Sequence, residues 1–123
     1  MAGSYKDLVA WRKAMRMALE IYRAMRAFPK DETYGLGNQL RRAAVSVPSN
    51  IAEGQGRYSR REFQHFLNNA RGSLAEIETQ ILLARELVYL PRKEADALLM
   101  KAGEVGRILN GLIAATRKEV FKS

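Results

Sequence analysis

The sequence of 123 residues contains few of the side chains that carry metal or catalytic chemistry: it has one histidine and no cysteine. Glu62 and His65 stand three positions apart, a spacing at which a bundle helix can present both side chains to one iron ion. A di-iron site needs a second Glu–His pair and two further carboxylates, and the chain has no second histidine. We therefore interpret His65 as a polar surface residue and expect no metal ion and no cofactor.

Motifs for covalent catalysis and for phosphate binding are also missing from the sequence. It contains neither Gly-x-Ser-x-Gly nor Ser-x-x-Lys, and Gly54 and Gly56 are followed by no Gly-Lys-Ser/Thr. Glu53 and Glu76 are the carboxylates that we expect to be partly buried, where hydrogen bonds to arginine or asparagine side chains are a sufficient role for them. We expect no catalytic residues and no enzymatic activity.

A strong excess of positive charge is the better lead to a function. Lys and Arg number 21 against 13 Asp and Glu, which gives a net charge of +8 and an isoelectric point near 10.1. Residues 1–30 hold seven basic and two acidic side chains, residues 91–123 hold seven and four, and the segments between them are neutral. The excess thus belongs to the first and last parts of the chain.

These basic side chains are the candidate contacts to nucleic acid. A face of lysine and arginine binds the phosphate groups of RNA or DNA in a salt-dependent and largely sequence-independent way, and Tyr58 can stack on an unpaired base. A charged surface that only keeps the protein in solution is the alternative. The candidate residues are Arg12, Arg16, Arg23, Arg57, Arg60, Arg61, Lys93, Arg107 and Lys118.

Four amphipathic helices are needed to position these side chains. Apolar residues recur at spacings of three and four over four segments, which predicts helices over about residues 7–27, 34–53, 59–90 and 92–120. The third is the clearest, because Ser59 and Glu62 form a capping box and an apolar seam runs from Phe63 to Val88. No segment alternates with a period of two, so we expect no strands. The pattern predicts an all-α protein: one domain, residues 1–123, folded as an antiparallel up-and-down four-helix bundle in which the first and last helices are neighbours.

One proline interrupts the second helix. Pro29 and Pro91 stand between predicted helices, whereas Pro48 lies within the second one. Pro48 has no N–H to donate to the carbonyl of Ala44, and its ring crowds the preceding turn. We therefore expect the second helix to be kinked at Pro48.

The first helix has an apolar surface wider than one bundle contact needs. A seam of apolar residues at spacings of three and four faces the predicted core: Leu8, Trp11, Met15, Ala18, Tyr22 and Met25. Ala14, Ile21 and Phe28 form a second row with Met17 beside it, and a small protein seldom leaves such a row in water. We predict that Ala14, Met17, Ile21 and Phe28 form the subunit interface of a homo-oligomer. The alternative is that the Pro29 segment and the second helix fold over this row.

Nothing in the sequence predicts export or membrane insertion. The amino-terminal segment lacks the apolar core of a signal peptide, and no uncharged stretch approaches the ~18 residues of a spanning helix. We expect a cytoplasmic protein without a membrane partner, and the lack of cysteine agrees with that compartment.

Three segments, residues 34–44, 45–54 and 70–76, together resemble the bacterial four-helix-bundle family of proteins encoded in intervening sequences of 23S rRNA genes. The run Ser-Val-Pro-Ser-Asn-Ile-Ala-Glu-Gly at residues 46–54 is the specific part of this resemblance. The resemblance implies a basic antiparallel bundle that assembles into rings, typically homopentamers, without known catalytic activity. It also implies a role related to nucleic acid, since relatives include the accessory proteins of diversity-generating retroelements, which are thought to engage RNA and a reverse transcriptase.

The residues of that run have a structural interpretation as well. Pro48 frees a backbone carbonyl, and Ser49, Asn50 and Glu53 are placed to satisfy polar groups around the expected kink before Gly54. A direct contact to a ligand or to nucleic acid is the other interpretation of these five residues. We expect an oligomeric, non-enzymatic protein that binds RNA or DNA, or acts as an accessory protein to such binding. The alternative is an oligomeric scaffold that binds another protein and has no direct nucleic-acid role.

Overall fold

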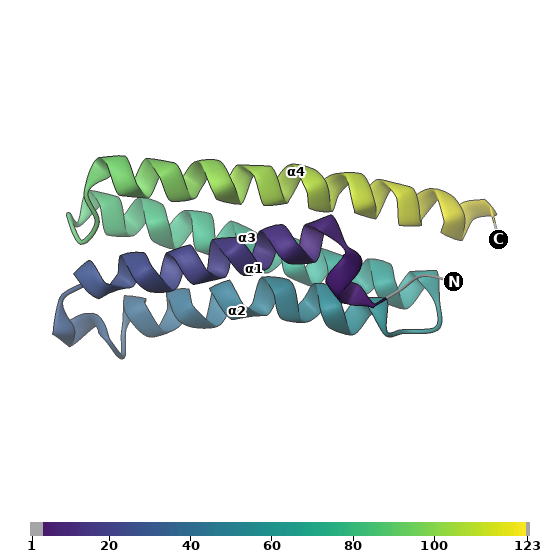
Figure 1. Cartoon of the computed structure of the whole chain (residues 1–123), viewed down its shortest axis with the longest axis horizontal. Coiled ribbons are helices and arrows are strands. Elements are labelled where there is room, and N and C mark those ends of the chain that lie inside the picture. Colours follow the sequence, from purple (N-terminus) through teal and green to yellow (C-terminus); the bar gives the residue numbers. More distant parts are fainter. Residues whose placement is uncertain (1–3, 123) are drawn as a thin grey trace.

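Four long helices form the protein, as seen in a computed structural model that describes residues 4–122 (Figure 1). Short 3-10 turns precede and follow the first of them, and no strand occurs among the described residues. The predicted all-helical fold is therefore confirmed. The long helices are α1 (Val9–Ala24), α2 (Leu36–Gln55), α3 (Arg60–Glu86) and α4 (Arg92–Lys122), and the short turns are η1 (Tyr5–Asp7), η2 (Met25–Ala27) and η3 (Lys30–Glu32).

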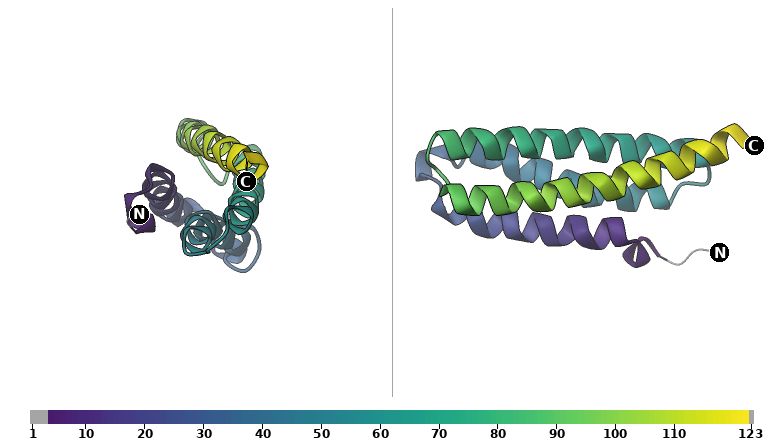
Figure 2. Two further views of the ribbon diagram at one scale, coloured as in Figure 1. Left: turned by 90° about the vertical axis from the view of Figure 1, so that its right-hand side faces the viewer. Right: turned by 90° about the horizontal axis from the view of Figure 1, so that it is seen from above.

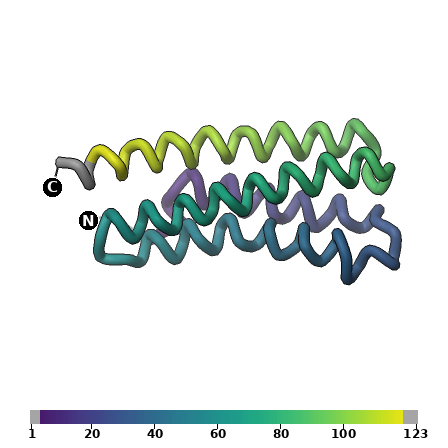
Figure 3. The backbone as a smooth tube through the Cα atoms, turned by 180° about the vertical axis from the view of Figure 1, so that it is seen from behind, coloured from purple at the N-terminus to yellow at the C-terminus, as the bar shows by residue number. Residues whose placement is uncertain are grey.

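The helices lie side by side along the length of the molecule (Figure 2). Helix α3 lies between α2 and α4, and packs most extensively against α2 (Figure 3). Helices α1 and α4 are neighbours too, joined by two ion pairs, Lys13 with Glu104 at 3.5 Å and Lys101 with Glu20 at 3.4 Å. In Figure 1 the start of α1, the α2–α3 turn and the end of α4 lie at the right-hand end, and the other two connections lie at the left-hand end.

Helix α3 begins where the sequence predicts. The Ser59 hydroxyl oxygen accepts a hydrogen bond from the backbone N–H of Glu62 at 3.1 Å, which satisfies one unpaired donor of the first turn. The predicted apolar seam is buried as far as Ala84, and together with the seams of α2 and α4 it forms the core. The largest fully buried side chains of these three helices are Leu40, Val47, Ile51, Leu67, Ile77, Ile81, Val105, Leu109 and Ile113.

The end of α3 differs from the prediction. The helix stops at Glu86, and Val88 takes a left-handed backbone conformation with φ 62°. The N–H groups of Val88 and Tyr89 then turn back to the carbonyls of Arg85 and Ala84, at 3.1 and 2.8 Å, as in a Schellman motif. Val88 is therefore 82% exposed, and its expected place in the apolar seam is wrong.

Helix α1 is rotated relative to the prediction. Ala14, Met17 and Ile21, which we assigned to a subunit interface, are 0%, 1% and 0% exposed and belong to the core of the bundle. Phe28 is half-buried against Tyr89, with ring centroids 5.7 Å apart. The predicted interface is therefore wrong for the three buried residues, and the place of Phe28 in an interface stays a prediction. The apolar arc of α1 is wide enough to allow two rotations, and the small Ala14 faces the core because it lets α1 approach its neighbours closely.

Helix α2 continues through Pro48, which is buried. The kink at this residue stays a prediction. None of the helices within residues 4–122 is long and apolar enough to cross a membrane.

Candidate nucleic-acid interface

The α2–α3 turn carries the most distinctive group of predicted contacts. Tyr58 is fully exposed at this turn, between Arg57 and the pair Arg60 and Arg61. A pocket of about 450 Å³ lies elsewhere, between α1 and α2, whereas the turn itself encloses a smaller pocket of about 370 Å³ lined in part by Arg57, Tyr58, Ser59 and Arg60. The ring of Tyr58 and the side chains of Arg57 and Arg60 thus line one depression that opens to solvent.

Close packing of two helices shapes this turn. A Cβ atom on Gly54 would lie 2.8 Å from Cβ of Phe66 and 3.0 Å from Cδ1 of Phe63, so the last turn of α2 crosses the first turns of α3 where only a glycine fits. Arg57 is held just beyond this crossing. Its guanidinium lies 4.8 Å from the centroid of the Phe66 ring and 3.8 Å from the Glu53 carboxylate.

The nine predicted basic residues are spread along the length of the bundle. Arg12 near the start of α1, the arginines of the α2–α3 turn and Lys118 near the end of α4 are exposed and belong to segments toward the right-hand side of Figure 1, whereas Arg16 lies in the middle of α1. Arg23 in the last turn of α1 and Lys93 in the first turn of α4 belong to the opposite end. The sequence correctly places charge on α1 and α4, but the structure brings only part of it together with the turn.

Acidic residues interrupt the positive charge along the α1–α4 contact. Glu104 and Glu20 each bind a lysine of the facing helix there, and Glu94 lines the depression on whose rim Arg23 lies. Arg107 is exposed on α4, with Nη1 of its side chain 3.6 Å from where a Cβ of Gly103 would lie. We therefore describe the candidate interface as the basic end, which comprises residues 57–61 with Arg12 and Lys118.

The run at residues 46–54 supplies a polar contact inside the helix pair α2–α3. Asn50 donates from Nδ2 to the backbone oxygen and the hydroxyl oxygen of Ser46, at 2.8 and 2.9 Å. The Ser46 hydroxyl in turn lies 2.7 Å from the hydroxyl of Ser73 on α3. Asn50, like the close-packed Gly54, therefore has a structural role, and periodicity alone gave no sign of Ser73, the partner of Ser46.

Two carboxylates and one serine are more exposed to solvent than we predicted. Glu53 and Glu76 are exposed rather than partly buried, and Glu53 pairs with Arg57 instead of with the middle of α2. Ser49 is exposed as well. These side chains point away from the core because they occupy the outward face of α2 and α3 at helical spacing. His65 is also exposed, and among the side chains of residues 4–118 no three of His, Cys, Asp or Glu gather closely enough to hold a metal ion.

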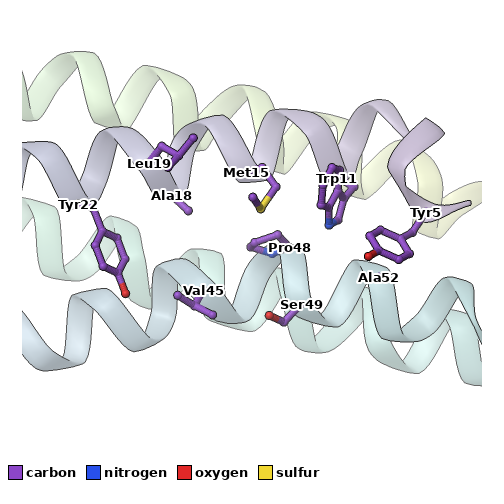
Figure 4. Close-up of a pocket in the computed structure, with 10 residues that line it drawn as sticks. All are labelled: Tyr5, Trp11, Met15, Ala18, Leu19, Tyr22, Val45, Pro48, Ser49 and Ala52. Carbon is purple, nitrogen blue, oxygen red and sulfur yellow. The ribbon is translucent and has the colours of Figure 1, made fainter.

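A surface groove between α1 and α2 is strongly apolar. Its volume is about 450 Å³, and Figure 4 shows Trp11, Met15 and Tyr22 of α1 facing Val45 and Pro48 of α2 across it. We did not predict this groove, because the apolar seam that contains Trp11, Met15 and Tyr22 was assigned to the core. The signal was present in the width of the apolar arc on the first helix.

One hydrogen-bonded pair joins the two connections at the other end of the bundle. Tyr89 donates from its hydroxyl to Oε2 of Glu32 at 2.8 Å, and Oε1 of Glu32 accepts the backbone N–H of Leu36 at 3.0 Å. These two hydrogen bonds, first that of Leu36 and then that of Tyr89, hold the pKa of Glu32 below its usual range. The same carboxylate, followed by burial of the ring, raises the pKa of Tyr89. Glu32 thus serves as the cap of α2, and the sequence offered no capping box to reveal it.

Comparison with known proteins agrees with this architecture. A crystal structure of a protein of unknown function from the S23 ribosomal protein family of Bacteroides thetaiotaomicron has the same fold, with a TM-score of 0.80 and 23% sequence identity over 85% of this chain and 98% of that chain. No curated protein sequence matches the chain. The family profile described as 23S rRNA-intervening sequence protein matches residues 6–111. Since this match covers most of the sequence, the chain belongs to the family of 23S rRNA-intervening sequence proteins.

Proposed function

We propose that this protein binds RNA through the basic end and has no enzymatic activity. The observation that carries the proposal is the full exposure of Tyr58 among Arg57, Arg60 and Arg61. A tyrosine ring in water loses no burial when it stacks on an unpaired base, and such stacking contributes about 1–3 kcal/mol per base. The neighbouring arginines would neutralise phosphates on either side. We expect this binding to take place in the cytoplasm.

A pair of exposed tyrosines provides the test. In Tyr58→Ala we expect the affinity for a single-stranded RNA oligonucleotide to fall about tenfold, because roughly 1.4 kcal/mol of stacking is removed. Tyr34 is the matched control, since it is 92% exposed at the opposite end and follows Asp31 and Glu32 instead of arginines. Fluorescence anisotropy at fixed salt measures both variants. Equal affinities of Tyr58→Ala, Tyr34→Ala and the unaltered protein would contradict the proposal.

We further propose that the protein self-associates through the apolar groove between α1 and α2. Leu19, Tyr22 and Val45 of this groove are each about half exposed, and such a surface is costly to leave in water. The family resemblance implies a ring of five subunits, which would repeat the basic end around an axis and strengthen RNA binding.

Two matched leucines test the self-association. Leu19 and Leu83 are 51% and 48% exposed, but only Leu19 lines the groove. We expect Leu19→Asp to reduce the molar mass measured by light scattering and Leu83→Asp to leave it unchanged. A monomeric unaltered protein at micromolar concentration would overturn the proposal.

A scaffold for another protein is the second candidate function, and the same groove favours it. A single stoichiometric protein partner that is retained after nuclease treatment, absent with Leu19→Asp and unaffected by Tyr58→Ala would favour the scaffold over RNA binding.

A further inference from the structure

A polar pocket lies between α2 and α3, separate from the basic end and from the apolar groove. It has a volume of about 440 Å³ and is lined by two rows of polar side chains that face each other across the helix pair. Buried Ser73 and Gln80 lie on its α3 side, and exposed Arg42 and Glu76 lie at its opening. The pocket therefore combines a buried polar interior with one charge of each sign.

Three side chains of this pocket have no partner among the described residues, and one of them, Gln80, is buried. Gln80 is only 8% exposed, and its carbonyl oxygen Oε1 is buried with no hydrogen-bond donor in reach. Within residues 4–118, neither Arg42 nor Glu76 makes an ion pair or a side-chain hydrogen bond, although both line the same pocket. A buried acceptor without a donor destabilises a protein, so its presence beside two unpaired charges points to a ligand.

The chemistry of these groups restricts the ligand. Glu76 and the Gln80 oxygen accept hydrogen bonds, whereas the Arg42 guanidinium only donates them. A free anion would be repelled by Glu76 and a free cation by Arg42, so the ligand is neutral and carries donors and acceptors on separate edges. Among the nucleobases, guanine places two adjacent donors, the N1–H and the N2 amino group, beside the acceptors O6 and N7. Arginine is the side chain that most often contacts O6 and N7 of guanine.

We propose that this pocket binds the guanine base of an unpaired nucleotide, with Glu76 and Gln80 accepting from its N1–H and N2 amino groups and Arg42 donating to its acceptor edge. The proposal rests on the proposed RNA binding and names a base that the protein selects. Arg42 in α2 and Arg57 just beyond its end are fifteen residues apart, which corresponds to roughly 20 Å, or about six stacked nucleotides. One strand of ten nucleotides can therefore reach the pocket and the basic end together.

Oligonucleotides that differ at one position test the selection. The probes are a labelled decauridylate and versions in which each position in turn is guanosine or adenosine, all measured by fluorescence anisotropy. At one position of the strand, we expect the oligonucleotide with guanosine to bind about tenfold more tightly than the one with adenosine. Well-placed hydrogen bonds discriminate bases to this degree. In Glu76→Gln this preference should disappear while decauridylate still binds. Glu78→Gln, on the same helix but outside the pocket, is the control and should retain the preference.

The variant Gln80→Met separates a binding role from a structural one. Methionine has a similar shape and removes the unpaired acceptor, so we expect a higher midpoint of thermal unfolding without RNA together with a reduced guanosine preference. A lower midpoint with an unchanged preference would overturn the proposal, because Gln80 would then be structural. A smaller molar mass in light scattering would also overturn it, since the pocket would then be a contact between subunits.

The outcomes also separate this inference from the proposed function. Salt-dependent binding of decauridylate with no guanosine preference would overturn the guanine pocket and leave RNA binding intact. Binding of guanosine monophosphate in calorimetry, abolished by Glu76→Gln, without any oligonucleotide binding would support the pocket and overturn the proposed RNA binding. Absence of both would overturn both.

Discussion

Val88 is the one residue other than glycine with a positive φ within the part of the chain that is described. A left-handed conformation costs an L-residue about 1–2 kcal/mol, and Val88 is a β-branched residue that regains little of this by packing because its side chain faces solvent. The Schellman hydrogen bonds donated by the N–H groups of Val88 and Tyr89 hold it in place. This strained conformation ends α3 before the turn to α4.

Replacing this valine with glycine should therefore stabilise the protein. We expect Val88→Gly to raise the free energy of unfolding by about 1 kcal/mol, since glycine adopts the left-handed conformation without a steric penalty. Leu87 provides the control: it has an ordinary φ of −80°, and Leu87→Gly should lower the free energy of unfolding. Urea denaturation measures both. A loss of stability in Val88→Gly would show that the valine is not strained.

At the scale of the elements, sequence periodicity predicts α3 and α4 well and α1 poorly. In α4 the seam residues Leu98, Ala102, Val105 and Leu109 are buried as expected, because each of these helices has one narrow apolar face. In α1 two apolar rows compete, and the choice between them depends on how closely the neighbouring helices approach, which a single helix does not specify. The left-handed Val88 was equally invisible, since no glycine marks that turn.

The α1–α2 connection and the α3–α4 turn are joined by the Glu32–Tyr89 hydrogen bond, which should make stability depend on pH. The pKa of Glu32 is lowered in the fold, so its contribution is present above the unfolded pKa near 4.3 and is lost as the pH falls through the folded value. The pKa of Tyr89 is raised, so its contribution is present below about pH 10 and is lost as the pH rises through the folded value.

Thermal unfolding across the pH range measures this dependence. We expect Glu32→Gln to lower the unfolding midpoint at neutral pH. It should also flatten the acid limb of the profile, which is the fall of the midpoint as the pH is lowered. Tyr89→Phe should flatten the alkaline limb. Glu78→Gln serves as the control and should leave both limbs in place. If Glu32→Gln had the same acid limb as the unaltered protein, the carboxylate would not be the group that titrates.

At the scale of the whole molecule, the net charge of +8 suggests a nucleic-acid partner but does not say where on the surface it binds. Segment counts assigned the excess to the first and last helices, and both are indeed basic. The two ion pairs between α1 and α4 then neutralise part of that side. The neutral segment that contains the α2–α3 turn contributes Arg57 and Tyr58, with Arg60 and Arg61 directly after it. Counting charge could not find this group, because most of the acids that balance its arginines lie in other parts of the same segments, and only Glu53 and Glu62 lie beside the turn.

Two charge reversals of equal size distinguish a local site from the effect of net charge. The double variants Arg60→Glu/Arg61→Glu and Arg23→Glu/Lys93→Glu change the net charge equally but at opposite ends of the bundle. If the basic end binds RNA, the first should lower affinity steeply and reduce the slope of log affinity against log salt by about 0.7 for each phosphate that is no longer neutralised. The second should change affinity only slightly, because its sites lie beyond the ~8 Å over which charges act at physiological salt. An equal fall in affinity in both variants would mean that the whole basic surface attracts RNA without a defined site.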